Sequence, residues 1–146
     1  MSRKEKKLPA LPKGRKDVPQ SAQQEHDGFT LPIGWNFSQM ETSSKTRWKC
    51  TFNRLTKHRG RLLALEGKSF QQIDVEQQHS HNWEDTSKLH PEFQQLLTNK
   101  KIESGALWQL DLGGKARLFG IRDRNIFKVV WLDEDHTIYK TSKKDT

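Results

Sequence analysis

The clearest hydrophobic pattern in the chain lies between Ala106 and Tyr139, where apolar and polar residues alternate along short segments. This alternation is typical of strands with a buried face, because successive side chains of a strand point to opposite sides. Turn-forming Gly, Asp and Asn residues separate the segments at 113–115 and 123–125. The pattern predicts an antiparallel meander of three strands. We expect these strands at residues 106–112, 116–122 and 126–132.

A basic helix is predicted for residues 45–61. Trp48, Phe52 and Leu55 recur there at the spacing of one helix face, so we expect all three to be buried against the sheet. The two serines at 43–44 offer an N-cap for this helix.

Further segments complete the predicted architecture. Residues 35–37 alternate as a short first strand, and residues 92–101 follow a proline as a short helix. The polar segment 77–83 is expected to be a loop. Residues 1–28 are rich in Lys, Arg and Pro and are expected to be a disordered basic tail. The sequence therefore predicts a single α+β domain over residues 29–146, with a short N-terminal strand and one or two helices packed on a C-terminal three-stranded antiparallel meander.

The charge of the chain points to a class of partner. The chain has 146 residues, a formal net charge of +8 and a pI near 9.7. Excess cations make nucleic acid the leading partner, since the phosphate backbone releases counterions when Lys and Arg bind it. The alternative that is compatible with the same net charge is a basic protein that binds no nucleic acid. Residues 45–61 favour a polyanion, because they contain no Asp or Glu and like charges one turn apart destabilise an isolated helix.

Cysteine content and hydropathy bear on the compartment. Cys50 is the single cysteine, so no internal disulfide can form and a reducing compartment is expected. No apolar run approaches the roughly 20 residues of a membrane span, and the Lys-rich start lacks the apolar region of a signal peptide. We therefore expect a cytoplasmic protein that does not enter a membrane.

Several common chemistries have no motif in the chain. It contains no P-loop, GxGxxG or GxSxG sequence. His79, His81 and His90 lack the spacing of a zinc site and Cys50 has no CxxC partner, so neither a metal nor another cofactor is expected. The consecutive acids at 133–135 point in different directions, unlike the carboxylates of a two-metal nuclease.

The meander instead carries residues suited to metal-independent cleavage of RNA. Its polar positions hold several cations, and it ends in His136 and Tyr139. Attack of a 2′-hydroxyl on phosphorus requires two proton transfers, for which the ordinary pKa of histidine, about 6.5, is suited. The charged phosphorane needs a fixed cation, for which the planar fork of arginine is suited.

The order of elements over residues 35–139 and two short motifs resemble the RelE/HigB/ParE superfamily of small bacterial toxins. Residues 116–119, Ala-Arg-Leu-Phe, are similar to that family's strand motif, in which an Arg follows a turn. Residues 129–132, Val-Val-Trp-Leu, with His136 and Tyr139 behind them, are similar to its final strand. The resemblance implies a toxin-like endoribonuclease that acts on mRNA in the ribosome and is neutralised by a protein antitoxin.

The resemblance also implies roles for individual residues. Arg117 would bind the scissile phosphate, His136 would act as general acid or base, and Tyr139 would support it. Lys115 would be a second phosphate contact. From the charge pattern, apart from the resemblance, the other cations expected to contact nucleic acid are Arg122, Arg124, Arg47, Arg54, Lys57 and Arg61.

Two alternatives stay open at this point. The chain is longer than the usual members of that family, and the acids at 133–135 follow the last strand where a ribonuclease favours cations. A non-catalytic basic module that binds RNA, DNA or ribosomes fits the same residues. So does a toxin of the same fold that targets a protein.

Overall fold

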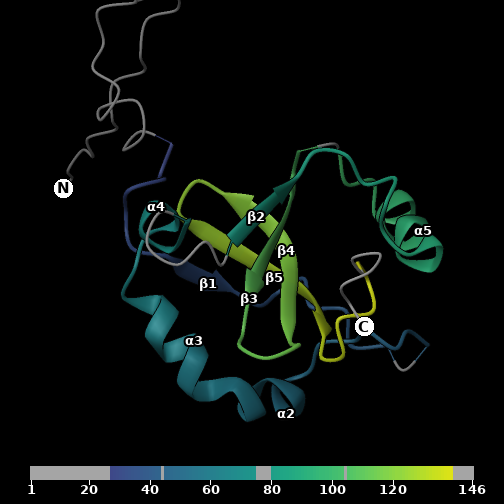
Figure 1. Ribbon diagram of the computed structural model, residues 1–146, viewed down its shortest axis with the longest axis horizontal. Coiled ribbons are helices and arrows are strands. Elements are labelled where there is room, and N and C mark those ends of the chain that lie inside the picture. Colours follow the sequence, from purple (N-terminus) through teal and green to yellow (C-terminus); the bar gives the residue numbers. More distant parts are fainter. Residues whose placement is uncertain (1–26, 44, 75–79, 104, 140–146) are drawn as a thin grey trace, which may run out of the picture.

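The computed structural model describes residues 27–43, 45–74, 80–103 and 105–139. Five strands form one mixed sheet in the order β1-β5-β4-β3-β2 (Figure 1). The predicted meander is confirmed, and each of its strands begins and ends within one residue of the expected position. Its strands are β3 (Leu107–Asp111), β4 (Arg117–Asp123) and β5 (Ile126–Asp133), paired antiparallel in that order. All but the last two residues of the predicted tail lie outside the described residues.

Two short strands complete the sheet at its edges. β1 (Gly34–Asn36) is the predicted first strand, and it runs parallel to β5 with Trp35 opposite Phe127. β2 (Ser80–Trp83) pairs antiparallel with β3, so the prediction of a loop there is wrong. β2 contains only one large apolar residue, Trp83. The backbone pairing of β2 with β3 therefore could not be predicted from the pattern of apolar and polar residues.

The sheet is buried on both faces. Leu110, Leu118 and Leu132 belong to the core on one face, whereas Phe119 and Trp131 belong to the core on the other. Helices α2 to α4 cover the first face and α5 covers the second (Figure 1). The helical elements are α2 (Phe52–Leu55), the 3-10 turn η1 (Thr56–His58), α3 (Arg59–Glu66), α4 (Phe70–Gln72) and α5 (Pro91–Asn99).

The predicted basic helix begins later than expected. Residues 45–51 are not helical, and α2 starts at Phe52. Thr51 is its N-cap, and the Thr51 hydroxyl accepts a hydrogen bond from the Arg54 N–H at 3.2 Å. The prediction that the serines at 43–44 cap this helix is therefore wrong.

Hydrogen bonds to the sheet explain the late start. The Leu132 N–H donates to the Trp48 carbonyl at 2.9 Å, and the Glu41 N–H donates to the Val130 carbonyl at 2.9 Å. Glu41 and Trp48 thus satisfy backbone groups of β5 beyond the end of β1. A helix over the same residues would leave those strand groups without these partners.

The change of helix start also alters the apolar stripe. Trp48 and Leu55 are buried as predicted, but Phe52 is 59% exposed, so its predicted packing against the sheet is wrong. Because Trp48 lies outside the helix, the spacing from Trp48 to Phe52 does not place them on one face. The Phe52 ring instead meets Phe37 of the segment after β1, with ring centroids 5.3 Å apart.

α5 confirms the predicted second helix. Phe93 and Leu97 are buried, and the side chain of His90 caps the helix by accepting a hydrogen bond from the Glu92 N–H. Within the described ranges, none of the helices has the length and apolar character needed to cross a membrane.

Candidate functional site

One end of the sheet collects most of the predicted site residues. Because β3, β4 and β5 are antiparallel neighbours, the C-terminal ends of β3 and β5 flank the N-terminal end of β4. Arg117 there is the register partner of both Asp111 and Asp133. We call this end of the sheet, together with the adjoining α2 and η1, the turn end; it lies lowest in Figure 1.

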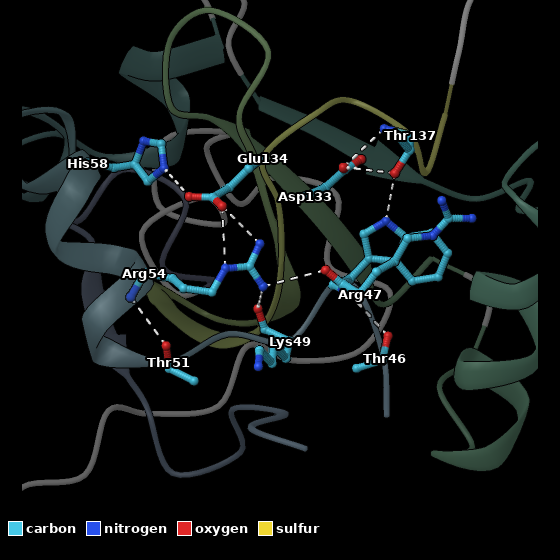
Figure 2. Close-up of polar contacts among 10 residues, drawn as sticks. Thr46, Arg47, Lys49, Thr51, Arg54, His58, Asp133, Glu134 and Thr137 are labelled. Carbon is cyan, nitrogen blue, oxygen red and sulfur yellow. Dashed lines mark hydrogen bonds and ion pairs between the residues drawn. The ribbon is translucent and has the colours of Figure 1, made fainter. Parts of the chain in front are cut away.

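Glu134 is the centre of a polar network at the turn end (Figure 2). Its Oε1 accepts hydrogen bonds from Arg54 Nη2 at 2.9 Å and Nε at 3.3 Å, and its Oε2 lies 3.1 Å from His58 Nε2. Burial raises the pKa of Glu134, but the hydrogen bonds from Arg54 and His58 and the charges of Arg54 and Lys57 outweigh it and lower the pKa overall. Glu134 is therefore a carboxylate at neutral pH.

Arg54 connects this network to the backbone. Its Nη1 donates to the carbonyls of Lys49 and Arg47, in the segment that lies along β5 (Figure 2). The guanidinium thereby joins α2, this segment and the residue after β5. Its contacts are those of a structural cation that also holds Glu134 in place.

Asp133 shapes the loop that carries the predicted catalytic histidine. Its side chain is 1% exposed and accepts hydrogen bonds from Thr137 N–H at 3.0 Å, Thr137 Oγ1 at 3.1 Å and Ile138 N–H at 2.7 Å. Trp48 Nε1 donates to the same Thr137 hydroxyl at 2.8 Å (Figure 2). Within this loop His136 has a φ of +58°, a left-handed conformation that only a few per cent of non-glycine residues adopt.

Cys50 lies beside this network but is unsuited to nucleophilic catalysis. It is fully buried, and burial raises the pKa of its thiol to about 12; Arg54 opposes this shift and Glu134 adds to it. The reactive form of a cysteine is the thiolate, which such a pKa excludes at neutral pH. In the described ranges, no group of three or more His, Cys, Asp or Glu residues is placed to hold a metal ion.

Arg117, the predicted phosphate ligand, is held by protein groups. Its Nε lies 3.0 Å from Asp111 Oδ1, and its Nη1 donates to the carbonyls of Gly114 and Ala116 at 2.8 and 2.9 Å. Its side chain is only 16% exposed. These contacts keep the charge of Arg117 at the turn end and neutralise Asp111.

Tyr139 is connected to Arg117 through a row of side chains across three strands. Its ring packs on Trp83 with centroids 4.9 Å apart, and Trp83 Nε1 donates to Gln109 Oε1 at 3.0 Å. Gln109 Nε2 in turn donates to Asp111 Oδ1, the atom that Arg117 contacts. The structure therefore links Tyr139 and Arg117, two of the predicted catalytic residues, through side chains that pack and hydrogen-bond within the domain.

Three other predicted cations belong to the turn end. Arg61 donates from Nε to the Asp111 carbonyl at 3.4 Å, which places it beside the β3–β4 turn. Lys57 in η1 and Lys115 in that turn are exposed. Neither lysine takes part in a salt bridge within the described part of the chain.

The remaining predicted cations lie elsewhere. Arg47 contacts His90 and Glu92 beside α5, at 2.8 and 3.4 Å. Arg124 is in the β4–β5 turn, at the opposite end of β4.

Arg122 is also at that opposite end, where it has a structural role. Its guanidinium lies 5.1–5.2 Å from the ring centroids of Phe29, Phe70 and Trp108 and donates to the Asp27 carbonyl. Burial lowers the pKa of Arg122 and the charge of Asp27 opposes this. An arginine nevertheless stays protonated in proteins, so these are cation–π contacts.

His58 and Glu134 are functional candidates that the sequence did not suggest. Arg54 and His58 are four residues apart, a spacing that places both on one side of a helical turn. That spacing is the only local signal that Arg54 and His58 act together. Glu134 lies 76 residues further along the chain than His58, so the sequence alone does not reveal that they meet.

Comparisons with known proteins identify a family. No curated protein and no solved structure matches the chain. These comparisons do not test the resemblance to the RelE/HigB/ParE superfamily, which stays a prediction. Residues 47–146 match the model of the family described as Uncharacterised protein UU032, and the matched range includes Arg54, His58 and Glu134. Because this match covers well over half of the chain, the protein belongs to the Uncharacterised protein UU032 family.

Proposed function

We propose that the protein binds nucleic acid through the cations of the turn end. The observation that carries this proposal is the pairing of Glu134 and Asp111 with cations there. Arg54 and His58 hold Glu134, and Arg117 holds Asp111. Lys57 in η1 and Lys115 in the β3–β4 turn are exposed at this turn end, in a chain with a formal net charge of +8.

The physical basis is the polyelectrolyte character of nucleic acid. Each lysine that neutralises a phosphate releases a condensed counterion, so affinity falls as salt rises. Carboxylates that are neutralised by a cation repel the phosphate backbone less than unpaired carboxylates would at the same positions. Arg61 adds positive charge beside the β3–β4 turn, because its Nε donates to the Asp111 carbonyl at the end of β3.

Salt titrations of a single-stranded RNA and a duplex DNA test the proposal. Lys57→Gln and Lys115→Gln should each reduce the slope of log K against log salt by about 0.7–0.9, without loss of stability. Lys88→Gln is the matched control, because Lys88 is an exposed lysine in the loop before α5. Affinity that is flat with salt, or equal losses in all three variants, would contradict the proposal.

A second candidate function is metal-independent cleavage of RNA, which the His58–Glu134 pair favours. A carboxylate that holds one ring nitrogen orients a histidine for proton transfer. In this reaction a base takes the 2′-hydroxyl proton, the oxygen attacks the adjacent phosphorus, and an acid protonates the departing 5′-oxygen. His58 and His136 are the proton-transfer candidates, and Arg117 supplies positive charge.

Inducible expression followed by mapping of RNA ends tests this second candidate. His58→Gln, or His136→Asn, which tolerates the left-handed backbone, should reduce cleavage by about 10²–10⁴-fold. Tyr139→Phe, which keeps the ring on Trp83, tests the supporting role of the hydroxyl. If the wild type cuts neither free nor ribosome-bound RNA, the protein is a binding module. Cytoplasmic location, action on the ribosome and a protein antitoxin stay predictions.

A further inference from the structure

An apolar groove with a volume of about 250 Å³ lies between α2, α3 and the β1 segment, and one face of α3 lines it. This helix runs along the outside of the domain (Figure 1), and Leu65 is its only buried residue. Leu63 is 62% exposed at the groove, and Phe52 is 59% exposed beside it. Exposed aromatic and aliphatic side chains that gather around a hollow mark interaction sites.

The face of α3 that lines the groove carries one charge at each end. Its four lining residues are Arg59, Leu62, Leu63 and Glu66. Their spacing of i, i+3, i+4 and i+7 places all four on one side of the helix. The two charges are about 10 Å apart along the helix axis. Within the part of the chain that the structure describes, neither Arg59 nor Glu66 forms an ion pair.

A second copy of the same face complements this pattern. In a two-fold interface the same patch of both subunits must be self-complementary. If two α3 helices pack antiparallel about such an axis, Arg59 of each copy lies beside Glu66 of the other, and the leucines of both copies lie between the two ion pairs. A parallel pair would instead bring like charges together, which is unfavourable. The balanced charges of this face therefore favour an antiparallel copy of α3.

We propose that this face of α3 binds a second copy of the chain in an antiparallel two-fold dimer. Leu63 of each copy would enter the groove of the other and pack beside Phe52. A cavity of about 150 Å³ accommodates benzene, so the groove has room for a leucine side chain. The proposal does not depend on nucleic-acid binding, because neither Lys57 nor Lys115 lines the groove.

The net charge of +8 on each copy opposes association, and salt limits this effect. At an ionic strength of about 0.15 M the Debye length is about 8 Å, so exposed charges farther than this from the contact are largely screened. Among the residues that line the groove, only Arg59 and Glu66 are charged, and their charges sum to zero. We therefore expect a dimer in physiological salt and weaker association at low salt.

Sedimentation equilibrium of the full-length protein in physiological salt tests the proposal. The wild type should show a concentration-dependent equilibrium between monomer and dimer. Leu63→Ser should weaken the dimer by about ten-fold or more, because the interface loses one leucine from each copy. Leu31→Ser is the matched control, because Leu31 is exposed outside the groove. Both leucines are exposed, so both variants should stay folded, which circular dichroism checks.

Charge reversal tests the antiparallel geometry. Arg59→Glu leaves an acid at both ends of the face, and Glu66→Arg leaves a cation at both ends. Each variant alone should therefore dimerise about ten-fold more weakly than the wild type, or worse. An equimolar mixture of the two variants should form a mixed dimer with an affinity close to that of the wild type, because each contact then joins an acid and a cation.

Three results would overturn the proposal. The first is a wild type that stays monomeric at millimolar concentration, which would leave the groove to a different protein or to the chain's own N-terminal segment. The second is a dimer that Leu63→Ser leaves unchanged, which would place the interface on another surface. The third is a mixture of the two charge variants that fails to pair, which would exclude the antiparallel arrangement of α3.

Discussion

Replacing Asp133 by Asn should destabilise the protein through the loop after β5. The carboxylate accepts three hydrogen bonds, two on Oδ1 from Thr137 and one on Oδ2 from Ile138. An asparagine has one acceptor oxygen, and its amide group can only donate, so at least one N–H loses its partner in either orientation. A buried donor left unpaired costs about 1–3 kcal/mol, and the retained bonds lose the strength of a charged acceptor. Part of this cost is offset because the asparagine side chain is easier to bury than a carboxylate. We therefore expect a loss of about 2–4 kcal/mol in the free energy of unfolding.

Urea denaturation followed by far-ultraviolet circular dichroism measures this loss. At the same time, the amide protons of Thr137 and Ile138 should exchange faster with solvent than in the wild type. Asp135→Asn is the matched control, since Asp135 is exposed two residues away and makes the same chemical change. Ordinary surface substitutions change the free energy of unfolding by no more than about 0.5 kcal/mol. If the free energy of unfolding of Asp133→Asn lies within that range of the wild type, the three hydrogen bonds do not hold the loop.

Three further predictions concern other parts of the molecule. Glu134 has a lowered pKa in the folded state, so its stabilisation is present above the unfolded pKa of about 4.3 and is lost as the pH falls through the folded pKa. The difference in unfolding free energy between wild type and Glu134→Gln should therefore be larger at pH 7 than at pH 3, and an equal difference would contradict the ionic role. Cys50 should resist iodoacetamide at pH 8 in the folded protein and react once urea unfolds it; fast labelling without urea would show that the thiol is accessible. Gly120→Ala should cost about 1–3 kcal/mol, because a Cβ there would meet the Lys128 carbonyl at the β4 bulge, whereas Gly60→Ala in α3 has free space and should stabilise by about 0.5–1 kcal/mol. Equal melting temperatures of the two glycine variants would refute this steric account.

The local signals in the sequence were sufficient for the meander and for α5. Alternation over a few residues and the Gly, Asp and Asn residues between the segments determine strands that pair with their sequence neighbours. The proline at the first position of α5 and the spacing of Phe93 and Leu97 determine that helix in the same local way. The position of Arg117 at the start of a strand, close to the turn that holds Lys115, follows from this meander.

The tertiary structure decided where the basic helix begins, which residues pair with the edges of the sheet, and what the site contains. Thr51 became the N-cap because the preceding segment bonds to β5, a strand that lies some 80 residues further along the chain. β2 exists because β3 offers backbone partners, not because its own residues favour a strand. Glu134 meets Arg54 and His58 only after β5 has packed beside α2 and η1. Contacts between such distant residues depend on the packing of the whole domain, and neither periodicity nor turn chemistry carries information about them.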